Sequence, residues 1–284
     1  PTELAEATER KTGKGVRNIL GMTECAGAIA VEPVHGPRTA LSCGLRMPFS
    51  EVAILGETDG DADPAKVLAA GETGIIALRG PNVSAGYSDP ARNAGTFLPG
   101  GWLVSGDLGK LDAEGRLYVT GRKKDIIIRG AHNIDPQMIE DALLAHPEVE
   151  NAAAVGMPDA YAGELPVAFV TLRAGSVLDG PVLVEFLRGR IDDPVALPKR
   201  IGIAETLPLT PVGKIFKPTL RREAIGWAIL GAAEAVGLEA GAVEVDVNEN
   251  METRVTVPPE KLEDLKGALA GMPITLTIVA GERA

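Results

Sequence analysis

Between residues 42 and 120 the chain alternates short hydrophobic runs with turn-forming residues, and this pattern restricts the possible folds more than any other feature. Turn signals such as Asp59-Gly60 and Glu114-Gly115 stand between the runs. Spacing of this kind predicts a small β-barrel or an antiparallel sheet. The expected strands cover residues 51–55, 74–79, 102–104 and 116–120.

From residue 122 onward the pattern changes to strands that alternate with helices. Pro136 marks the start of one helix and His146-Pro147 its end. This alternation predicts a compact α+β domain of about 100 residues. The expected strands cover residues 126–128, 149–155, 167–172 and 200–204, and the expected helices cover residues 136–145 and 182–190.

The two ends of the chain have their own patterns. Residues 4–11 read as a helix and residues 16–20 as a strand that leads into a polar turn at 21–24. The loop 207–214 precedes a long helix at 218–236. The remaining segment predicts strands at 242–247, 253–257 and 274–279, with a helix at 260–270.

Charge and composition exclude several classes of function. The net charge of −11 disfavours binding to nucleic acid, so any anionic substrate must meet local positive groups. Two cysteines form neither a disulfide framework nor a metal motif, which favours a reducing, cytoplasmic location. The first residues have neither a basic segment nor an apolar run, so no signal peptide is expected, and the apolar stretch 225–238 is expected to be too short to span a bilayer.

The turn Gly21-Met22-Thr23-Glu24 follows an expected strand, where backbone N–H groups can meet a nucleotide or a phosphate. Thr23 could donate to a phosphate oxygen, and Glu24 could hold Mg²⁺, which prefers hard oxygen ligands. The alternative is a helix N-cap with an acidic first turn. By itself, the motif favours this second interpretation.

Three further segments carry side chains that could bind a nucleotide or its phosphates. Asp107, in the turn 105–107, could accept both hydroxyls of a ribose or belong to an ordinary β-turn. The basic segment 121–125 could offset nucleotide charge or be a solvated linker. Lys214 follows two prolines and a glycine in its loop, and it could be a mobile charge for a reacting phosphate or an ordinary surface lysine.

In this order and spacing, the motifs resemble those of the acyl-adenylate-forming superfamily, which includes acyl-CoA synthetases, peptide-synthetase adenylation domains and firefly-type luciferases. The resemblance covers residues 15–222, and the stretches RGAHNIDP and GKIFKP look closest to bacterial medium- and long-chain acyl-CoA synthetases. It rests on GMTE, GETG…G…GY, SGD, GRKKDIIIRG and LPLTPVGK.

The resemblance implies a carboxylate–CoA ligase that uses ATP and Mg²⁺ to form acyl-AMP and then acyl-CoA, with a fatty acid as the expected substrate. Gly21 and Met22 would lie at the nucleotide. Thr23 would contact the α-phosphate, Glu24 would bind Mg²⁺, and Asp107 would bind the ribose hydroxyls.

The resemblance also implies roles in the second half of the matched region. Arg122 would support the ribose and phosphate side, and Lys124 would be the hinge between a large and a small domain. Lys214 would be the lysine needed for adenylation. The residues expected along the CoA pantetheine channel are Gly130, Ala131 and His132.

The sequence departs from the family pattern in ways that bear on these roles. Leu20 stands where the family usually has an aromatic residue against adenine, and Ala131 stands where a glycine is usual. No Ser/Thr/Gly-rich phosphate loop ending in Pro-Lys occurs. The chain is therefore expected to be a C-terminal portion that is inactive by itself.

The predicted class is α+β, in three parts. Residues 1–121 are expected to form a β-barrel-like remnant of the large domain, and residues 122–222 a small α+β lid domain. Residues 223–284 are expected to add a helix and a ββαβ-like extension, which could serve oligomerisation or regulation. Two alternatives stay open: an adenylation domain that loads a carrier protein, and a non-catalytic interaction module.

Overall fold

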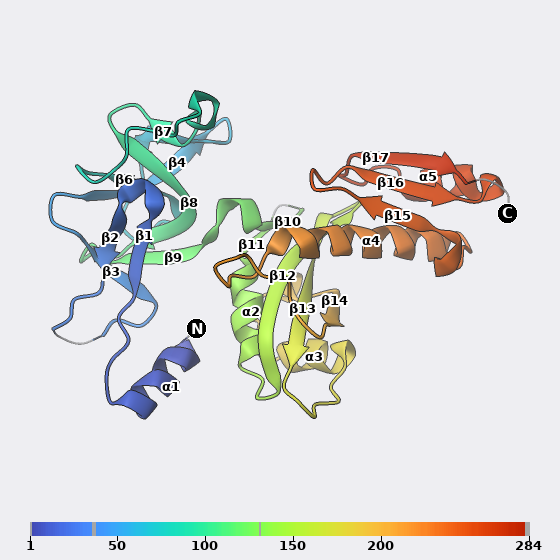
Figure 1. The fold of residues 1–284 in the computed structure, drawn as a ribbon, viewed down its shortest axis with the longest axis horizontal. Helices are drawn as coiled ribbons and strands as arrows, with labels where there is room; N and C mark the ends of the chain where they lie inside the picture. The colour runs from blue at the N-terminus through green and yellow to red at the C-terminus, as the bar shows by residue number, and fades with distance from the viewer. Residues whose placement is uncertain (1, 36–37, 131, 282–284) are drawn as a thin grey trace. The chain divides into compact units, whose positions relative to one another are not determined.

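The computed structural model describes residues 2–35, 38–130 and 132–281, which form two compact units. The first unit ends at Lys124 and the second begins at Asp125. Strands and helices occur in both units, as Figure 1 shows. The predicted α+β class is therefore confirmed.

A nine-stranded sheet follows helix α1 (Thr2–Thr12) in the first unit. Neighbouring strands run in the order β1-β2-β3-β9-β8-β6-β4-β5, and β7 pairs with β8. Within the described residues this is an open antiparallel sheet that does not close into a barrel. The strands are β1 (Ile19–Met22), β2 (Gly27–Val31), β3 (Ser42–Arg46), β4 (Glu51–Thr58), β5 (Asp61–Val67), β6 (Gly74–Arg79), β7 (Phe97–Leu98), β8 (Trp102–Leu111) and β9 (Leu117–Arg122).

Strand β6 lies inside this sheet and is buried on both faces. Ile76 and Leu78 join one hydrophobic core, whereas Ala77 joins a separate cluster with Ala53 and Leu55 of β4. Successive side chains of a strand point to opposite faces, so the continuous run Ile-Ile-Ala-Leu supplies both clusters.

The second unit begins with a five-stranded sheet between two layers of helices. The order is β11-β10-β13-β12, with β14 parallel to β13. Helices α2 and α3 share one core with the sheet, whereas the start of α4 shares the core on the other face. The elements are β10 (Ile127–Arg129), β11 (His132–Ile134), α2 (Pro136–Leu144), β12 (Val149–Asp159), β13 (Gly163–Leu172), α3 (Gly180–Leu187), β14 (Arg200–Ile203) and α4 (Lys217–Ala235).

Helix α4 is shared by two hydrophobic cores. Leu220 and Ala224 pack against the five-stranded sheet, whereas Ile229 and Ala233 pack against the C-terminal elements. With 19 residues the helix is about 28 Å long, enough to serve both. The C-terminal elements are β15 (Glu244–Val247), β16 (Thr253–Val257), α5 (Leu262–Ala268) and β17 (Leu276–Ala280).

The C-terminal segment has the predicted ββαβ order. Strands β15 and β16 are antiparallel, whereas β16 and β17 are parallel and joined through α5. Among the described residues, no helix combines the length and the apolar character needed to cross a membrane.

Candidate functional site

The motif at residues 21–24 differs from the predicted turn. Gly21 and Met22 belong to strand β1, and the turn is the short 3₁₀ helix Thr23–Cys25. A Cβ atom at Gly21 would lie 2.2 Å from the carbonyl oxygen of Gly27. Gly21 therefore permits close strand pairing, and the prediction that it opens the turn was wrong by two residues.

Glu24 has a well-defined partner in Tyr87. The Tyr87 hydroxyl donates a hydrogen bond to Glu24 Oε1 at 2.6 Å. The Tyr87 ring packs edge-on against Phe97, with ring centroids 5.4 Å apart, and the Arg92 guanidinium lies 4.9 Å above it. The hydrogen bond to Glu24, together with burial, raises the pKa of Tyr87, so the phenol stays a donor.

The loop around residues 82–87 also holds the backbone of the same turn. The Ser84 amide donates to the Glu24 carbonyl at 2.8 Å, and the Asn82 side chain donates to the Cys25 carbonyl at 2.8 Å. Glu24 is thus fixed by its main chain and its side chain, whereas the Thr23 side chain is exposed.

Sequence reasoning treated Tyr87 only as part of a turn-rich motif. The Gly86-Tyr87 pair was the sequence signal that could have identified Tyr87, because Gly86 adopts φ +142°, a backbone conformation that favours glycine. The Asn93 side chain accepts the Tyr87 amide at 2.7 Å, which fixes the backbone at this point. The partnership with Glu24 spans 63 positions, so local patterns could not reveal it.

Asp107 lies within strand β8 opposite Arg122 of β9. The Arg122 Nε donates to Asp107 Oδ1 at 3.0 Å. The Asp107 side chain is 14% exposed, whereas that of Arg122 is 54% exposed. The carboxylate therefore sits in a sheltered place with its charge balanced, and the guanidinium reaches solvent.

The segment 105–107 is an irregular point inside β8 and not the predicted turn between strands. Gly106 adopts φ +78°, a left-handed conformation that favours glycine. The Ser105 hydroxyl donates to the Ile76 carbonyl at 3.0 Å and accepts the Asp107 amide at 3.0 Å. These contacts set the direction of the Asp107 carboxylate.

A cavity of about 460 Å³ lies beside this irregular point. Its lining combines the backbone of β8 with three consecutive basic residues, which suits an anionic ligand. Lys123 also pairs with Glu57 at 2.7 Å. The lining residues are Ser105, Gly106, Arg122, Lys123 and Lys124.

The two acidic positions are connected through the sheet. Glu24 contacts Tyr87, Tyr87 packs on Phe97, and Phe97 of β7 pairs with Leu103 of β8. Asp107 follows four residues later on the same strand. The first unit therefore carries Glu24, Asp107 and Arg122 on one connected framework.

The predicted hinge residue lies in a short 3₁₀ helix, Lys123–Asp125, which follows β9. The division into two compact units falls directly after Lys124. In the second unit, Asp125 pairs with Arg221 of α4 at 2.9 Å. The segment after Lys124 is therefore attached to the second unit from its first residue.

The predicted CoA-facing turn lies between strands β10 and β11. Gly130 adopts φ +59°, and its amide donates to the Ala162 carbonyl at 2.6 Å. His132 is exposed at the start of β11, opposite Arg129. Ala131 lies outside the described residues.

The Lys214 loop is tightly closed by its own backbone. The Thr210 amide donates to the Lys214 carbonyl at 2.7 Å, and the Lys214 amide donates to the Thr210 hydroxyl at 3.0 Å. Leu209 and Ile215 form an isolated antiparallel bridge. The Lys214 side chain is exposed and makes no ion pair with any residue that the structure describes.

A nearly buried ion pair anchors the helix that follows this loop. Lys217 Nζ lies 2.7 Å from Glu140 Oε1 on α2, and the two side chains are 18% and 10% exposed. The same oxygen accepts the Ala154 amide at 2.9 Å. Burial raises the pKa of Glu140, and the nearby Lys217 only partly offsets this effect.

Across the described residues, no group of three or more His, Cys, Asp or Glu side chains could hold a metal by itself. A metal held through one carboxylate and the phosphates of a nucleotide does not need such a group, since Mg²⁺ is usually bound in that way.

Family models match both units of the chain. The model for AMP-binding enzymes matches residues 1–88, and the model for the AMP-binding enzyme C-terminal domain matches residues 138–214. The first matched segment contains Glu24 and Tyr87, and the second ends on Lys214.

Known proteins with similar sequences include CoA ligases. A marinolic acid–CoA ligase from Pseudoalteromonas sp. (strain SANK 73390) is 42% identical, with 79% of this chain and 34% of the relative covered. A long-chain-fatty-acid–CoA ligase from Bacillus subtilis (strain 168) is 35% identical, with 78% and 39% covered.

The fold matches solved structures as well. ATP-bound MatB from Rhodopseudomonas palustris has a TM-score of 0.71 at 31% identity, with 78% of this chain and 43% of that chain covered. The present chain thus spans 34–43% of the length of these three proteins.

Proposed function

The chain belongs to the acyl-adenylate-forming superfamily and matches its C-terminal portion, and from this we propose that it serves an ATP-dependent carboxylate–CoA ligase. In the proposed reaction a carboxylate attacks the α-phosphorus of ATP, which gives acyl-AMP and pyrophosphate. The CoA thiol then attacks the acyl carbonyl and releases AMP. Two similar proteins are CoA ligases for marinolic acid and long-chain fatty acids, which favours a fatty acid here.

The observation that carries this proposal is the Asp107–Arg122 pair beside a cavity with three basic residues. A sheltered carboxylate can accept the two hydroxyls of a ribose, and the neighbouring cations can balance phosphate charge. We assign Asp107 to the ribose, and Arg122 to the ribose and phosphate side.

We assign the turn 23–25 to the phosphates. Thr23 presents an exposed hydroxyl that can donate to an α-phosphate oxygen. Glu24 fits a Mg²⁺ ligand, because a carboxylate with one oxygen bonded to Tyr87 still has a second oxygen to offer. When bound, Mg²⁺ would neutralise charge on the phosphates.

We assign Lys214 to adenylation. The reacting carboxylate is already ionised at neutral pH, so this step needs positive charge at the phosphate and no general base. A closed loop that holds the backbone while leaving the ammonium exposed suits this role. In the same proposal, Lys124 is the hinge, and the turn containing Gly130 and His132 serves the CoA pantetheine.

The test is acid-dependent ATP–pyrophosphate exchange by the full-length protein, followed by thioester formation with CoA. A panel of fatty and aryl carboxylic acids would identify the substrate, and a carrier-protein thiol in place of CoA would test the alternative acceptor. We expect exchange with fatty acids and transfer to CoA. Failure of every acid to stimulate exchange would contradict the proposal.

A further inference from the structure

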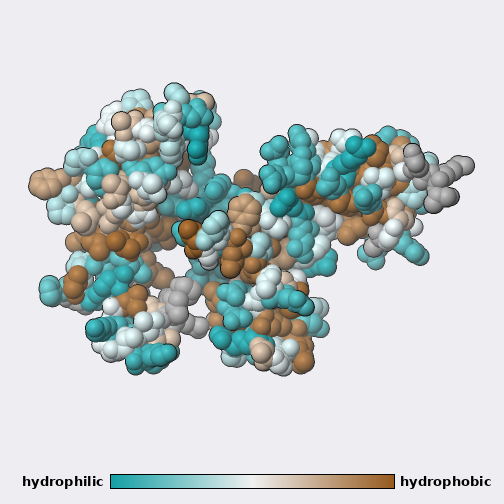
Figure 2. Space-filling view, viewed as in Figure 1, coloured by the Kyte–Doolittle hydropathy of each residue, from teal (hydrophilic) through white to brown (hydrophobic). Residues whose placement is uncertain are grey.

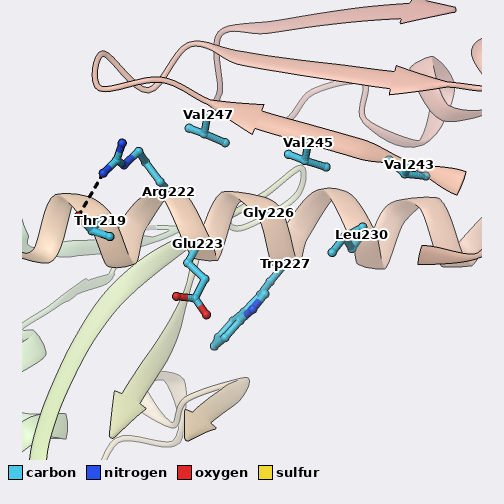
Figure 3. Close-up of a pocket in the computed structure, with 9 residues that line it drawn as sticks. All are labelled: Thr219, Arg222, Glu223, Gly226, Trp227, Leu230, Val243, Val245 and Val247. Carbon is cyan, nitrogen blue, oxygen red and sulfur yellow. Dashed lines mark hydrogen bonds between the residues drawn. The ribbon is translucent and has the colours of Figure 1, made fainter. Parts of the chain in front are cut away.

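A groove of about 570 Å³ lies between helix α4 and strand β15, away from every residue assigned above. In Figure 3, Val245 and Val247 of β15, and Val243 just before this strand, face the helix across this groove. Family models match the chain only up to residue 214, so none of the groove lies within a matched segment.

The two ends of the groove differ in chemistry. At one end, Arg222 donates to the Thr219 hydroxyl at 3.2 Å, below Val247 (Figure 3). At the other end, Leu230 lies below Val243. The groove therefore has a cationic, hydrogen-bonding end and an apolar end.

The middle of the groove is open because Gly226 has no side chain. A Cβ atom added at this position would meet nothing within 4 Å. Figure 2 shows hydrophobic and hydrophilic residues side by side along the visible face of this region. A slender ligand could thus lie along the helix without displacing protein atoms.

The guanidinium of Arg222 favours an anionic group on the ligand. Arg222 makes no ion pair among the described residues, although the chain carries a net charge of −11. Its planar guanidinium matches a carboxylate. Glu223 also lines the groove, but in Figure 3 its side chain points to the side of α4 away from β15, whereas Arg222 points toward Val247.

From these features we propose that the groove between α4 and β15 binds an unbranched apolar carboxylate, with its carboxylate at Arg222 and its chain running toward Leu230. The helix rises about 16 Å between Thr219 and Leu230, which suits a chain of medium length. This site is separate from the proposed nucleotide site and does not depend on the proposed ligase activity.

The groove can be filled without disturbing the fold. Gly226→Leu would place a side chain in the open middle, and Gly231→Leu is its matched control on the same helix. A Cβ at Gly231 also meets nothing within 4 Å, but this residue does not line the groove. Both changes should favour the helix to a similar degree.

The experiment is calorimetric titration of the 284-residue chain with decanoate below its micelle concentration. We expect saturable binding to the unchanged chain and to Gly231→Leu, and at least about tenfold weaker binding to Gly226→Leu, a loss of about 1.4 kcal/mol. Equal binding to all three proteins, or no binding to the unchanged chain, would overturn the proposal.

A second arm tests the carboxylate end and still applies if Gly226→Leu folds poorly. Arg222→Gln should weaken decanoate binding about tenfold. Glu223→Gln, the neighbouring charge change, should leave it equal or tighter. In the unchanged chain 1-decanol should bind more weakly than decanoate. Equal affinity for the acid and the alcohol, or no effect of Arg222→Gln, would overturn the assignment of a carboxylate.

Discussion

The Asp107–Arg122 ion pair on strands β8 and β9 and the lysine loop before α4 hold their key side chains in different ways. Asp107 is sheltered, fixed by Ser105 and paired with Arg122 across the sheet. Lys214 has an equally well-fixed backbone, but its side chain is exposed. The structure thus fixes a carboxylate in one region and leaves an ammonium free to move in the other.

This difference fits the proposed roles. A group that grips a ribose acts best from one position, because a preorganised acceptor loses little freedom on binding. A cation that approaches the phosphate only during adenylation can have a mobile side chain, provided that the backbone of its loop is fixed. The five predictions below test this contrast, and their magnitudes run from the largest expected effect to the smallest.

Loss of the Lys217–Glu140 ion pair, which anchors helix α4 after the lysine loop, should have the largest effect, a decrease in the free energy of unfolding. Lys217→Met would leave the Glu140 carboxylate largely buried without its charged partner, and removing one partner of a buried pair typically costs about 3–5 kcal/mol. Denaturant unfolding would measure the loss, and Glu140→Gln with Lys217→Met should recover much of it. An unchanged unfolding midpoint would show that the pair does not hold the helix.

The carboxylate of the same ion pair gives stability a dependence on pH. Burial raises the pKa of Glu140 above its ordinary 4.5. Between pH 4.5 and the raised pKa, the folded state therefore binds a proton that the unfolded state releases. This contribution makes stability fall as pH rises from about 4.5 through the raised pKa. Glu140→Gln should lack that slope in denaturation measured between pH 4 and pH 7.

Lys214→Ala in the full-length protein should reduce adenylation about 100- to 1,000-fold, or about 2.7–4 kcal/mol, because a charge aimed at the reacting phosphate is lost. Thioester formation from supplied acyl-AMP should be spared, and stability should not change, because the side chain is exposed. Lys199→Ala, another exposed lysine, is the control. Equal losses in both half-reactions would contradict the assignment.

Asp107→Asn should raise the KM for ATP about tenfold to a hundredfold, since a hydrogen bond to a charged group contributes about 1.5–3 kcal/mol. Steady-state kinetics of the full-length protein would measure this. Glu51→Gln breaks an exposed ion pair with Arg79 on the same sheet and should leave KM unchanged. If both variants behave alike, the sheltered site has no special role.

Tyr87→Phe should have the smallest effect, because it removes one hydroxyl and keeps the ring contacts with Phe97 and Arg92. We expect the Mg²⁺ concentration for half-maximal adenylation to change about threefold to tenfold, or about 0.5–1.5 kcal/mol. Direct titration with Mn²⁺ in the presence of ATP would report the metal apart from turnover. No change in the Mg²⁺ requirement or in Mn²⁺ affinity would show that Tyr87 only supports the loop.

The sequence determined most elements by itself. The helix at α2 follows from Pro136 and the spacing of Ile139 and Leu143, and the ββαβ order of the tail follows from its alternating runs. These signals are local, since a hydrophobic repeat and a turn residue act over a few positions. The family resemblance was also readable, because it rests on ordered short motifs.

Only the tertiary structure decided which residues meet. Gly21 is a strand residue that lies directly against Gly27. Glu24 accepts a hydrogen bond from Tyr87, which is 63 positions away in the sequence. The sequence also did not reveal that two hydrophobic cores share α4, or that a groove lies beside this helix. Such contacts depend on strand register and on the closure of long loops, and no short stretch of sequence encodes these.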